Sequence, residues 1–336
     1  MASGAARALG SAARRARRAA SIVRARAAGD GGVYAGSYFG AGRDPLDRMG
    51  LSGYERYDRD TSNANAAAYL VWRWFEARRA LDVGCATGFV VEAMRELGID
   101  ARGVDVSRYA VARAAHGARG HLRRADLTRR LPFRSRRFDV VTALETLEHL
   151  PPRAVPGALR ELRRVTAAYV VATIPSFGPN QHGPGGWFPV KVRDELVAHY
   201  VSLGPAYQGP VPYEDLYRDA GGAPIEGHLT IASFGWWTDR FADAGLVRCG
   251  PAERAMHPHL ARFGLTKYWN LYVLRRPEAP EPGADVRTAS EIAAWEANFG
   301  LADRTADPED LRAVAEALAR PAQAVGSVAR SDTPPR

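Results

Sequence analysis

Residues 80–105 combine a glycine-bearing turn with two carboxylates, and these could hold a nucleoside cofactor. An apolar run reaches Asp82, the turn follows with Gly84 and Gly88, and a helical pattern leads to a second apolar run that ends at Asp105. Glycines let the backbone approach a ligand closely, and ligands of open α/β sheets bind outside the carboxyl ends of the strands. A carboxylate at Asp105 can accept hydrogen bonds from two ribose hydroxyls. The stretch therefore predicts a site for an adenosine-containing cofactor.

The turn lacks the G-x-G-x-x-G spacing of a dinucleotide site. Residues 84–88 read G-C-A-T-G, with Asp82 two residues before the first glycine. A carboxylate at that position suits a cationic ligand rather than a pyrophosphate, which disfavours a nicotinamide-dependent oxidoreductase. We expect Cys85 to be a packing residue rather than a nucleophile.

A second group of reactive side chains, Glu145, Glu148 and His149, follows the apolar run 138–144. Residues three and four apart share a face of a helix, so these side chains would project together. Carboxylate oxygens suit Mg²⁺, and an imidazole can act as a general base. Three roles stay open for the group: a divalent-cation site, a metal-free functional role for His149, and a purely structural role.

The D-V-G-C-A-T-G turn resembles motif I of the class I S-adenosylmethionine (SAM)-dependent methyltransferases. In that family the glycine loop holds the amino-acid half of SAM, and the acid of the second strand holds the ribose. One departure is Ala86, where many members have glycine. An acid after strand three bonds the adenine and the next residue covers the ring; by position these are Asp126 and Leu127, although Asp126 could also be an ordinary turn residue. The resemblance implies ten cofactor-binding residues: Asp82, Gly84, Cys85, Ala86, Gly88, Asp105, Val106, Asp126, Leu127 and Leu144.

Residues 145–149 are similar to the E-x-x-E-H motif of the ubiquinone-biosynthesis O-methyltransferases and of the small-RNA 3′-end methyltransferases. In both groups these residues bind a metal that orients the acceptor hydroxyls, whereas many relatives keep only the E-H pair and use no metal. The resemblance implies that Glu145, Glu148 and His149 are catalytic and, with Mg²⁺, metal ligands. Further candidates for the substrate pocket are His182, Trp187 and His228. The two histidines could equally be polar loop residues.

Strand-like runs alternate with helical patterns, which predicts an α/β fold with a doubly wound, mostly parallel, seven-stranded sheet of the Rossmann-like class I methyltransferase type. After the two strands of residues 80–105, strands are expected at His121–Ala125, Phe138–Leu144, Ala168–Ile174, Leu246–Cys249 and Tyr268–Arg275, the last two as an antiparallel pair. Helices are expected at Asn63–Arg78, from an N-cap at Ser107 to about Ala115, at Pro152–Arg164 and at Ser233–Ala244.

Residues 33–276 are expected to form the methyltransferase domain, with an insertion at 176–231 after strand five. The insertion is rich in proline, glycine and aromatic residues, and a structureless insertion of this length is unusual unless it is functional. We expect it to build the substrate pocket; the alternative is a surface insertion with its own small core. Residues 277–336 are predicted to be a linker and a C-terminal helical extension, with a capping box at Thr288–Glu291 and a helix start at Asp307-Pro308.

The chain has 336 residues, a net charge of +9 and two cysteines. No apolar run reaches the roughly 18 residues of a membrane span, and the cysteine count fits a reducing cytosol, so a cytoplasmic location is expected. Residues 1–32 are predicted to be a basic, disordered tail; seven arginines and no acid in residues 1–28 would also suit a transit peptide or an arm for nucleic acid or anionic membrane. Abundant arginine and alanine with only two lysines is typical of a GC-rich genome.

These features predict a SAM-dependent methyltransferase that acts on a hydroxyl of a small molecule, such as a sugar, polyketide or phenolic. The alternatives are a nucleic-acid (RNA) methyltransferase that uses the basic N-terminal arm and a non-catalytic SAM-binding protein. We do not expect a nucleic-acid partner, because most of the excess charge lies in the N-terminal segment and no nucleic-acid-binding motif is present. The acceptor and the oligomeric state stay open.

Overall fold

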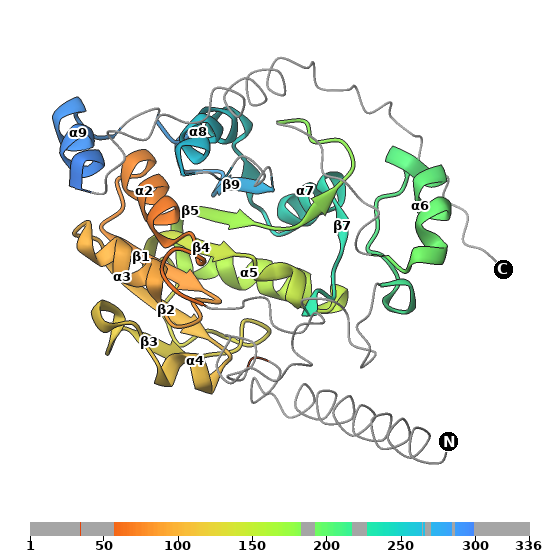
Figure 1. Ribbon diagram of the computed structural model, residues 1–336, viewed down its shortest axis with the longest axis horizontal. Coiled ribbons are helices and arrows are strands. Elements are labelled where there is room, and N and C mark those ends of the chain that lie inside the picture. The colour runs from red at the N-terminus through yellow and green to blue at the C-terminus, as the bar shows by residue number, and fades with distance from the viewer. Residues whose placement is uncertain are drawn as a thin grey trace, which may run out of the picture.

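The computed structural model describes residues 34, 57–182, 192–216, 227–263, 265, 270–283 and 286–298. Seven strands form one sheet in the order β3-β2-β1-β4-β5-β9-β8 (Figure 1). The strands are β1 (Arg79–Val83), β2 (Asp100–Asp105), β3 (Leu122–Arg124), β4 (Phe138–Leu144), β5 (Thr166–Thr173), β8 (Val247–Arg248) and β9 (Leu271–Arg275). Strands β1 to β5 are parallel, and β9 runs antiparallel between β5 and β8. The predicted sheet, including its closing antiparallel pair, is confirmed.

Helices cover both faces of the sheet because its central strands are apolar on both sides. In β4, Val140 packs with α2 (Ala64–Trp74), α3 (Phe89–Glu96) and α8 (Gly250–Arg262), and Val141 packs with α5 (Val155–Val165) and α7 (Phe234–Asp243). Buried residues recur on α5 at intervals of three and four, as expected for a helix that lies on a sheet. None of the helices described is long and apolar enough to cross a membrane.

The chain order fixes where a ligand would bind. The chain runs from β1 outward to β2 and β3 and then returns to form β4 on the other side of β1. Connections that leave adjacent strands in opposite directions open a crevice at their carboxyl ends, which is the usual ligand site of such sheets. The residues after β1, β2 and β4 are therefore brought to one edge.

The helices differ from the prediction in several places, of which α2, α4 and α8 are the clearest. Helix α2 ends at Trp74 rather than at residue 78, because Phe75 is extended and the chain turns directly into β1. Helix α4 (Arg108–Ala112) begins at the predicted cap, where the Ser107 side chain accepts from the Ala110 amide at 3.1 Å, but it ends three residues early. Helix α8 was not predicted; it contains Pro258, a residue that ordinarily interrupts a helix.

The insertion after β5 has a small core of its own in the part that the structure describes. Its ends pair as β6 (Ser176–Phe177) and β7 (Ala232–Ser233), and α6 (Val197–Leu203) lies between them. Six buried residues form this core: Phe177, Val192, Tyr200, Val211, Leu216 and Ile231. A small core of its own was the alternative expectation for the insertion. Val211 and Tyr213 nevertheless also line the cavity described below.

The C-terminal extension packs on the body through α9 (Ala289–Asn298). The predicted capping box is formed, because the Thr288 amide donates to Glu291 Oε2 at 2.8 Å and the Glu291 amide donates to Thr288 Oγ1 at 3.3 Å. Trp295 stacks on Trp72 of α2, with ring centroids 6.1 Å apart. The predicted helix start at residue 307 and the predicted tail 1–32 lie outside the described residues.

Candidate functional site

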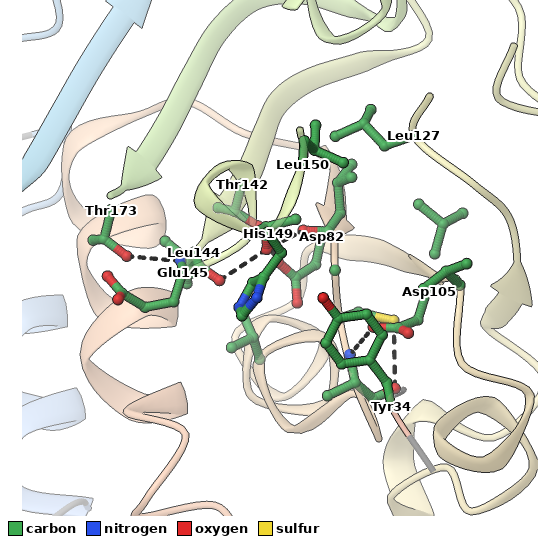
Figure 2. Close-up of a pocket in the computed structure, with 18 of the residues that line it drawn as sticks. Tyr34, Asp82, Asp105, Leu127, Thr142, Leu144, Glu145, His149, Leu150 and Thr173 are labelled. Carbon is green, nitrogen blue, oxygen red and sulfur yellow. Dashed lines mark hydrogen bonds between the residues drawn. The ribbon is translucent and has the colours of Figure 1, made fainter. Parts of the chain in front are cut away.

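A cavity of about 1280 Å³ lies at the carboxyl ends of β1, β2 and β4. Its walls come from these strand ends, from α2, from the connection between β4 and α5, and from the insertion. Figure 2 shows Asp82, Asp105 and His149 around it. Small-molecule sites are typically clefts of roughly 300–1,000 Å³. The cavity is therefore large enough for a cofactor and a second small molecule together.

Asp82, at the end of β1, is fully enclosed beside β4. Its Oδ1 accepts a hydrogen bond of 2.7 Å from Thr142 Oγ1, because the register of β1 and β4 sets the two residues side by side. Burial raises the pKa of Asp82 to about 7; the hydrogen bond from Thr142 opposes this rise, and the nearby Asp105 carboxylate adds to it. A buried carboxylate without a cation is costly, so the site favours a positively charged group beside Asp82.

The turn after β1 needs glycine at its first position. Gly84 has φ +78°, and a Cβ there would overlap the side chain of Thr146 from the β4–α5 connection. Ala86 also has a positive φ, 48°, which is unusual for a residue with a side chain. Its amide donates to Asp105 Oδ2 at 2.8 Å. This hydrogen bond holds the alanine in the position where the family often has glycine.

Asp105 ends β2 and is held by two backbone donors. Besides Ala86, the Ser107 amide donates to Asp105 Oδ1 at 2.7 Å. Burial raises the pKa of Asp105, and the two amides counteract the rise. Because a carboxylate has about four acceptor positions, the fixed side chain retains the capacity to accept from a ligand's hydroxyls in the cavity, which it lines.

Cys85 is buried, and burial raises the pKa of its thiol well above the usual value. A protonated thiol is a poor nucleophile. This agrees with the expected packing role. Gly88 caps the start of α3 with φ +84° and does not line the cavity.

Val106, Asp126 and Leu127 line the cavity beside β2 and β3, and Leu144 lines it at the end of β4. Asp126 also serves as the turn residue that was its alternative role, since its Oδ1 accepts from the Thr128 amide at 2.8 Å and from Thr128 Oγ1 at 2.7 Å. Leu127 is buried in the core below. An aliphatic side chain in that place can cover one face of a planar ring.

Glu145 does not share a helical face with Glu148 and His149, contrary to expectation. It has φ +46°, and the helical turn begins only at η4 (Leu147–His149), a single turn of 3₁₀-helix. Its side chain accepts a hydrogen bond of 2.7 Å from Asn270 Nδ2 instead. Glu145 lines the cavity but stands apart from the other two residues.

His228 takes the place that Glu145 was expected to fill. Each of Glu148, His149 and His228 offers one donor atom, and these atoms lie within 4.8 Å of one another. His228 Nε2 is 3.8 Å from Glu148 Oε1, and the two imidazole rings meet edge to face at 5.0 Å. The backbone fixes this approach, because the Leu229 and Thr230 amides both donate to the Glu148 carbonyl, at 2.8 and 2.9 Å.

The other two substrate candidates have different outcomes. His182 is not in the cavity: its ring packs against Gly250 at the start of α8, and its Nδ1 is 3.2 Å from a guanidinium nitrogen of Arg254. Burial and neighbouring arginines lower its pKa to about 4. The expectation for His182 is therefore corrected, whereas Trp187 lies outside the described residues.

Three residues of the site were not singled out from the sequence. Thr142 and Tyr34 line the cavity, and Asn270 adjoins it through its hydrogen bond to Glu145. Thr142 lies within the apolar strand β4, and no sequence pattern links it to Asp82, its neighbour in the adjacent strand β1. Asn270 precedes β9, far from Glu145 in sequence. Tyr34 meets the His149 ring edge to face at 5.5 Å, and its carbonyl accepts from Ser107 Oγ at 2.5 Å. In Figure 2 the Tyr34 ring faces the same space as His149, Asp82 and Asp105.

Comparisons with known proteins agree with this site. Residues 81–169 match the family model described as "Methyltransferase domain". Over 107 residues the chain is 34% identical to a ubiquinone biosynthesis O-methyltransferase of Methylococcus capsulatus, which covers 29% of this chain and 44% of that protein. Over 165 residues it is 30% identical to the protein of the same name from Cereibacter sphaeroides, covering 45% and 63%. The chain thus spans about half the length of these curated relatives.

Among solved structures, an amino pentose methyltransferase from Micromonospora echinaspora is 18% identical, with 73% of this chain and 96% of that chain covered and a TM-score of 0.41. The matched segment 81–169 contains the end of β1, the glycine turn, Asp105, Asp126 and His149, all of which contribute to the cavity lining, together with Glu148 beside His149. Residues 81–169 of this chain thus match a methyltransferase domain and are similar to the ubiquinone biosynthesis O-methyltransferases.

Proposed function

We propose that this protein transfers the methyl group of SAM to a hydroxyl oxygen of a small-molecule acceptor. The observation that carries the proposal is one cavity that holds the two cofactor carboxylates, Asp82 and Asp105, together with His149 and His228. The similarity to ubiquinone biosynthesis O-methyltransferases supports a hydroxyl as the acceptor. Two buried, free cysteines support a reducing compartment such as the cytoplasm as the place of action.

Asp105 would accept hydrogen bonds from the ribose hydroxyls, and Asp82 would face the amino group of the methionine half. Leu127 would cover the adenine ring. Bound SAM supplies an activated methyl group on a sulfonium. The main task of the protein is then to align the acceptor oxygen, and such positioning can contribute roughly 7–11 kcal/mol.

His149 is the group that we assign to the acceptor's proton. Its Nδ1 is 3.3 Å from the Gly227 carbonyl, which can only accept a hydrogen bond. Nδ1 must therefore carry the hydrogen, and Nε2 keeps a lone pair that can take a proton. The neighbouring Tyr34 ring and His228 hold the imidazole from two sides.

A divalent cation is the alternative means of activating the hydroxyl at the same place. One carboxylate and two imidazoles within 4.8 Å of one another fit such an ion, and Glu148, His149 and His228 would hold it. An imidazole-rich set suits zinc, iron or nickel better than Mg²⁺, which prefers oxygen ligands. Glu145, expected as a ligand, would contribute from the cavity wall only if it released Asn270.

The test is production of S-adenosylhomocysteine (SAH) with a panel of phenolic, catechol and sugar acceptors, each paired with its O-methylated form as a blocked control. We expect turnover with a free hydroxyl and none with the blocked form. His149→Gln should lower kcat by about 10²–10⁴-fold, the usual contribution of a general base, and leave the KM for SAM unchanged. Activity that is abolished by EDTA and restored by a divalent metal would select the metal alternative; a His149→Gln enzyme with full kcat would contradict the assigned role.

A further inference from the structure

The positive charge of this protein is concentrated in one short segment of the folded domain. Residues 102–137 contain eleven arginines and two acids, whereas the rest of the chain contains thirty-five basic and thirty-five acidic residues. The remainder has no net charge, because acidic residues elsewhere in the chain offset the seven arginines of residues 1–28. We propose that this basic edge, residues 102–137, is a binding surface for the phosphate backbone of a nucleic acid.

The basic edge surrounds the outermost strand of the sheet. Among the strands that the structure describes, β3 pairs only with β2, and the segment runs from β2 through α4 and β3 to the start of β4 (Figure 1). Ten of its eleven arginines are exposed. The arginines of β2, α4 and β3 lie at this end of the sheet. The last arginines of the segment lie on the connection that leads to β4, where the Arg136 amide donates to the Arg164 carbonyl of α5.

Most of this charge is not neutralised by the described part of the protein. Arg129 is 3.7 Å from Asp126, Arg136 is 2.5 Å from Glu278 and Arg137 is 3.9 Å from Asp100. Six further exposed arginines form no ion pair with a described carboxylate: Arg102, Arg108, Arg119, Arg123, Arg130 and Arg134. Of the two acids in the segment, Asp105 is buried in the cavity, so it does not screen the surface.

The chemistry of the surface favours a polyanion with closely spaced phosphates. A guanidinium presents a fork of donors that matches phosphate oxygens. Neutralising successive phosphates releases condensed counterions, and this alone can supply the affinity of a sequence-independent complex. The surface therefore needs no apolar contact to bind a nucleic acid.

Two other anionic partners fit the surface less well. A stable protein partner usually needs buried aromatic or aliphatic anchors at the centre of the interface, and residues 102–137 expose no large hydrophobic side chain. Without an exposed large hydrophobic side chain, the segment also has no group that could insert into an anionic membrane. The three-residue strand β3 also offers little edge for pairing with another strand.

The basic edge adjoins the cofactor end of the cavity. Asp126, Leu127 and Thr128 line the cavity, and Arg129 and Arg130 follow them directly. A bound strand would therefore lie beside the adenine end, on the side of the sheet away from His149 and His228. This surface is independent of the proposed methyl transfer and assigns the nucleic acid no role as acceptor.

The test is fluorescence anisotropy of the full chain with a labelled 20-nucleotide RNA and its DNA counterpart, from 50 to 300 mM KCl. The test variant is Arg119→Gln/Arg123→Gln, on either side of the turn into β3. The matched control is Arg160→Gln/Arg254→Gln, on α5 and α8, which removes the same charge from exposed positions away from β3. Thermal unfolding verifies that both variants are folded.

We expect the test variant to lose affinity by on the order of tenfold for each phosphate contact at 50 mM salt, and to reduce the slope of log affinity against log salt by about 1.4 for single strands. The control should match the wild type. Absence of binding at 50 mM KCl, equal losses in both variants, or binding that the test variant leaves intact would overturn the proposal. Binding to vesicles with 30% phosphatidylserine through Arg119 and Arg123, with no binding to RNA or DNA, would overturn it in favour of a membrane.

Discussion

Replacing Thr142 by valine should change how cofactor binding depends on pH. The substitution keeps the shape of the side chain and removes the hydroxyl that donates to Asp82 Oδ1 at 2.7 Å. That hydrogen bond stabilises the ionised carboxylate, whose pKa burial has raised to about 7. A hydrogen bond to a charged group contributes about 1.5–3 kcal/mol. Since 1.36 kcal/mol corresponds to one pKa unit, the variant should raise the pKa of Asp82 by about 1–2 further units.

The consequence for SAH binding follows from the sign of this shift. The cationic amino group of SAH needs the ionised form of Asp82, which is about half populated at pH 7 in the wild type. A rise of one to two units leaves about 1–10% of Asp82 ionised at that pH. The affinity for SAH should then fall about 5- to 50-fold at pH 7 and recover toward the wild-type value by pH 9.

The stability of the cofactor-free protein depends on pH in the opposite sense to SAH affinity: it falls as the pH rises. Because the pKa of Asp82 is higher in the folded than in the unfolded chain, its contribution to stability is fully present below about pH 4 and is lost as the pH rises through about 7. The loss is about 4 kcal/mol for three pKa units. The Thr142→Val protein should lose more of its free energy of unfolding, and the loss should extend to higher pH.

The assay is calorimetric titration with SAH at pH 6, 7, 8 and 9 on the wild type, Thr142→Val and Thr142→Ser. Serine keeps the hydroxyl and serves as the matched control, so its pH profile should follow the wild type. A Thr142→Val protein that is folded and has the wild-type pH profile would refute the reasoning, because Asp82 would then not depend on this hydrogen bond.

Two further substitutions test the turn and the buried ion pair. Gly84→Ala should abolish SAH binding, because the new Cβ overlaps Thr146 and φ is +78°; calorimetry on the folded variant measures this, and wild-type affinity would contradict the assigned turn. Glu253→Gln should lower the free energy of unfolding by about 3–5 kcal/mol, since it leaves the Arg248 guanidinium, 2.8 Å away and almost fully buried, without its partner. Chemical denaturation measures the loss, and Arg248→Met/Glu253→Met should recover part of it; a loss below about 1 kcal/mol would show that the pair is not effectively buried.

The sheet was predictable because its strands are apolar runs that need cover on both faces. Phe138–Leu144 is a strand over the predicted residues, and Asp82 and Asp105 meet in one cavity because each lies at the carboxyl end of a parallel strand. Fold and cofactor site thus follow from local pattern combined with the rule that ligands bind at strand ends.

The acceptor end of the site was less predictable because it depends on contacts that are distant in sequence. Helical spacing suggested that Glu145, Glu148 and His149 form one face, but the positive φ of Glu145 and its bond to Asn270 separate it from the others. His228 joins the group only because the chain returns from the insertion beside Glu148. No sequence pattern specifies such a return.

The charge distribution shows a related limit. Treating the N-terminal segment as the main carrier of positive charge hid the concentration in residues 102–137, which becomes a surface feature only once β3 is known to be the outer strand. Helix α8 was also missing from the prediction; it contains Pro258, which ordinarily interrupts a helix, and it packs on the sheet.

The most direct test of the central claim is calorimetric titration of SAH into the wild type, Asp105→Asn and Asp100→Asn. Asp105 ends β2 in the cavity, whereas Asp100 begins the same strand and is exposed. The account predicts saturable, micromolar binding to the wild type and to Asp100→Asn, and an affinity about 10- to 100-fold lower for Asp105→Asn, because the charged acceptor for the ribose hydroxyls is lost. No binding to the folded wild type, or equal binding by Asp105→Asn, would contradict the assignment of this cavity to SAM.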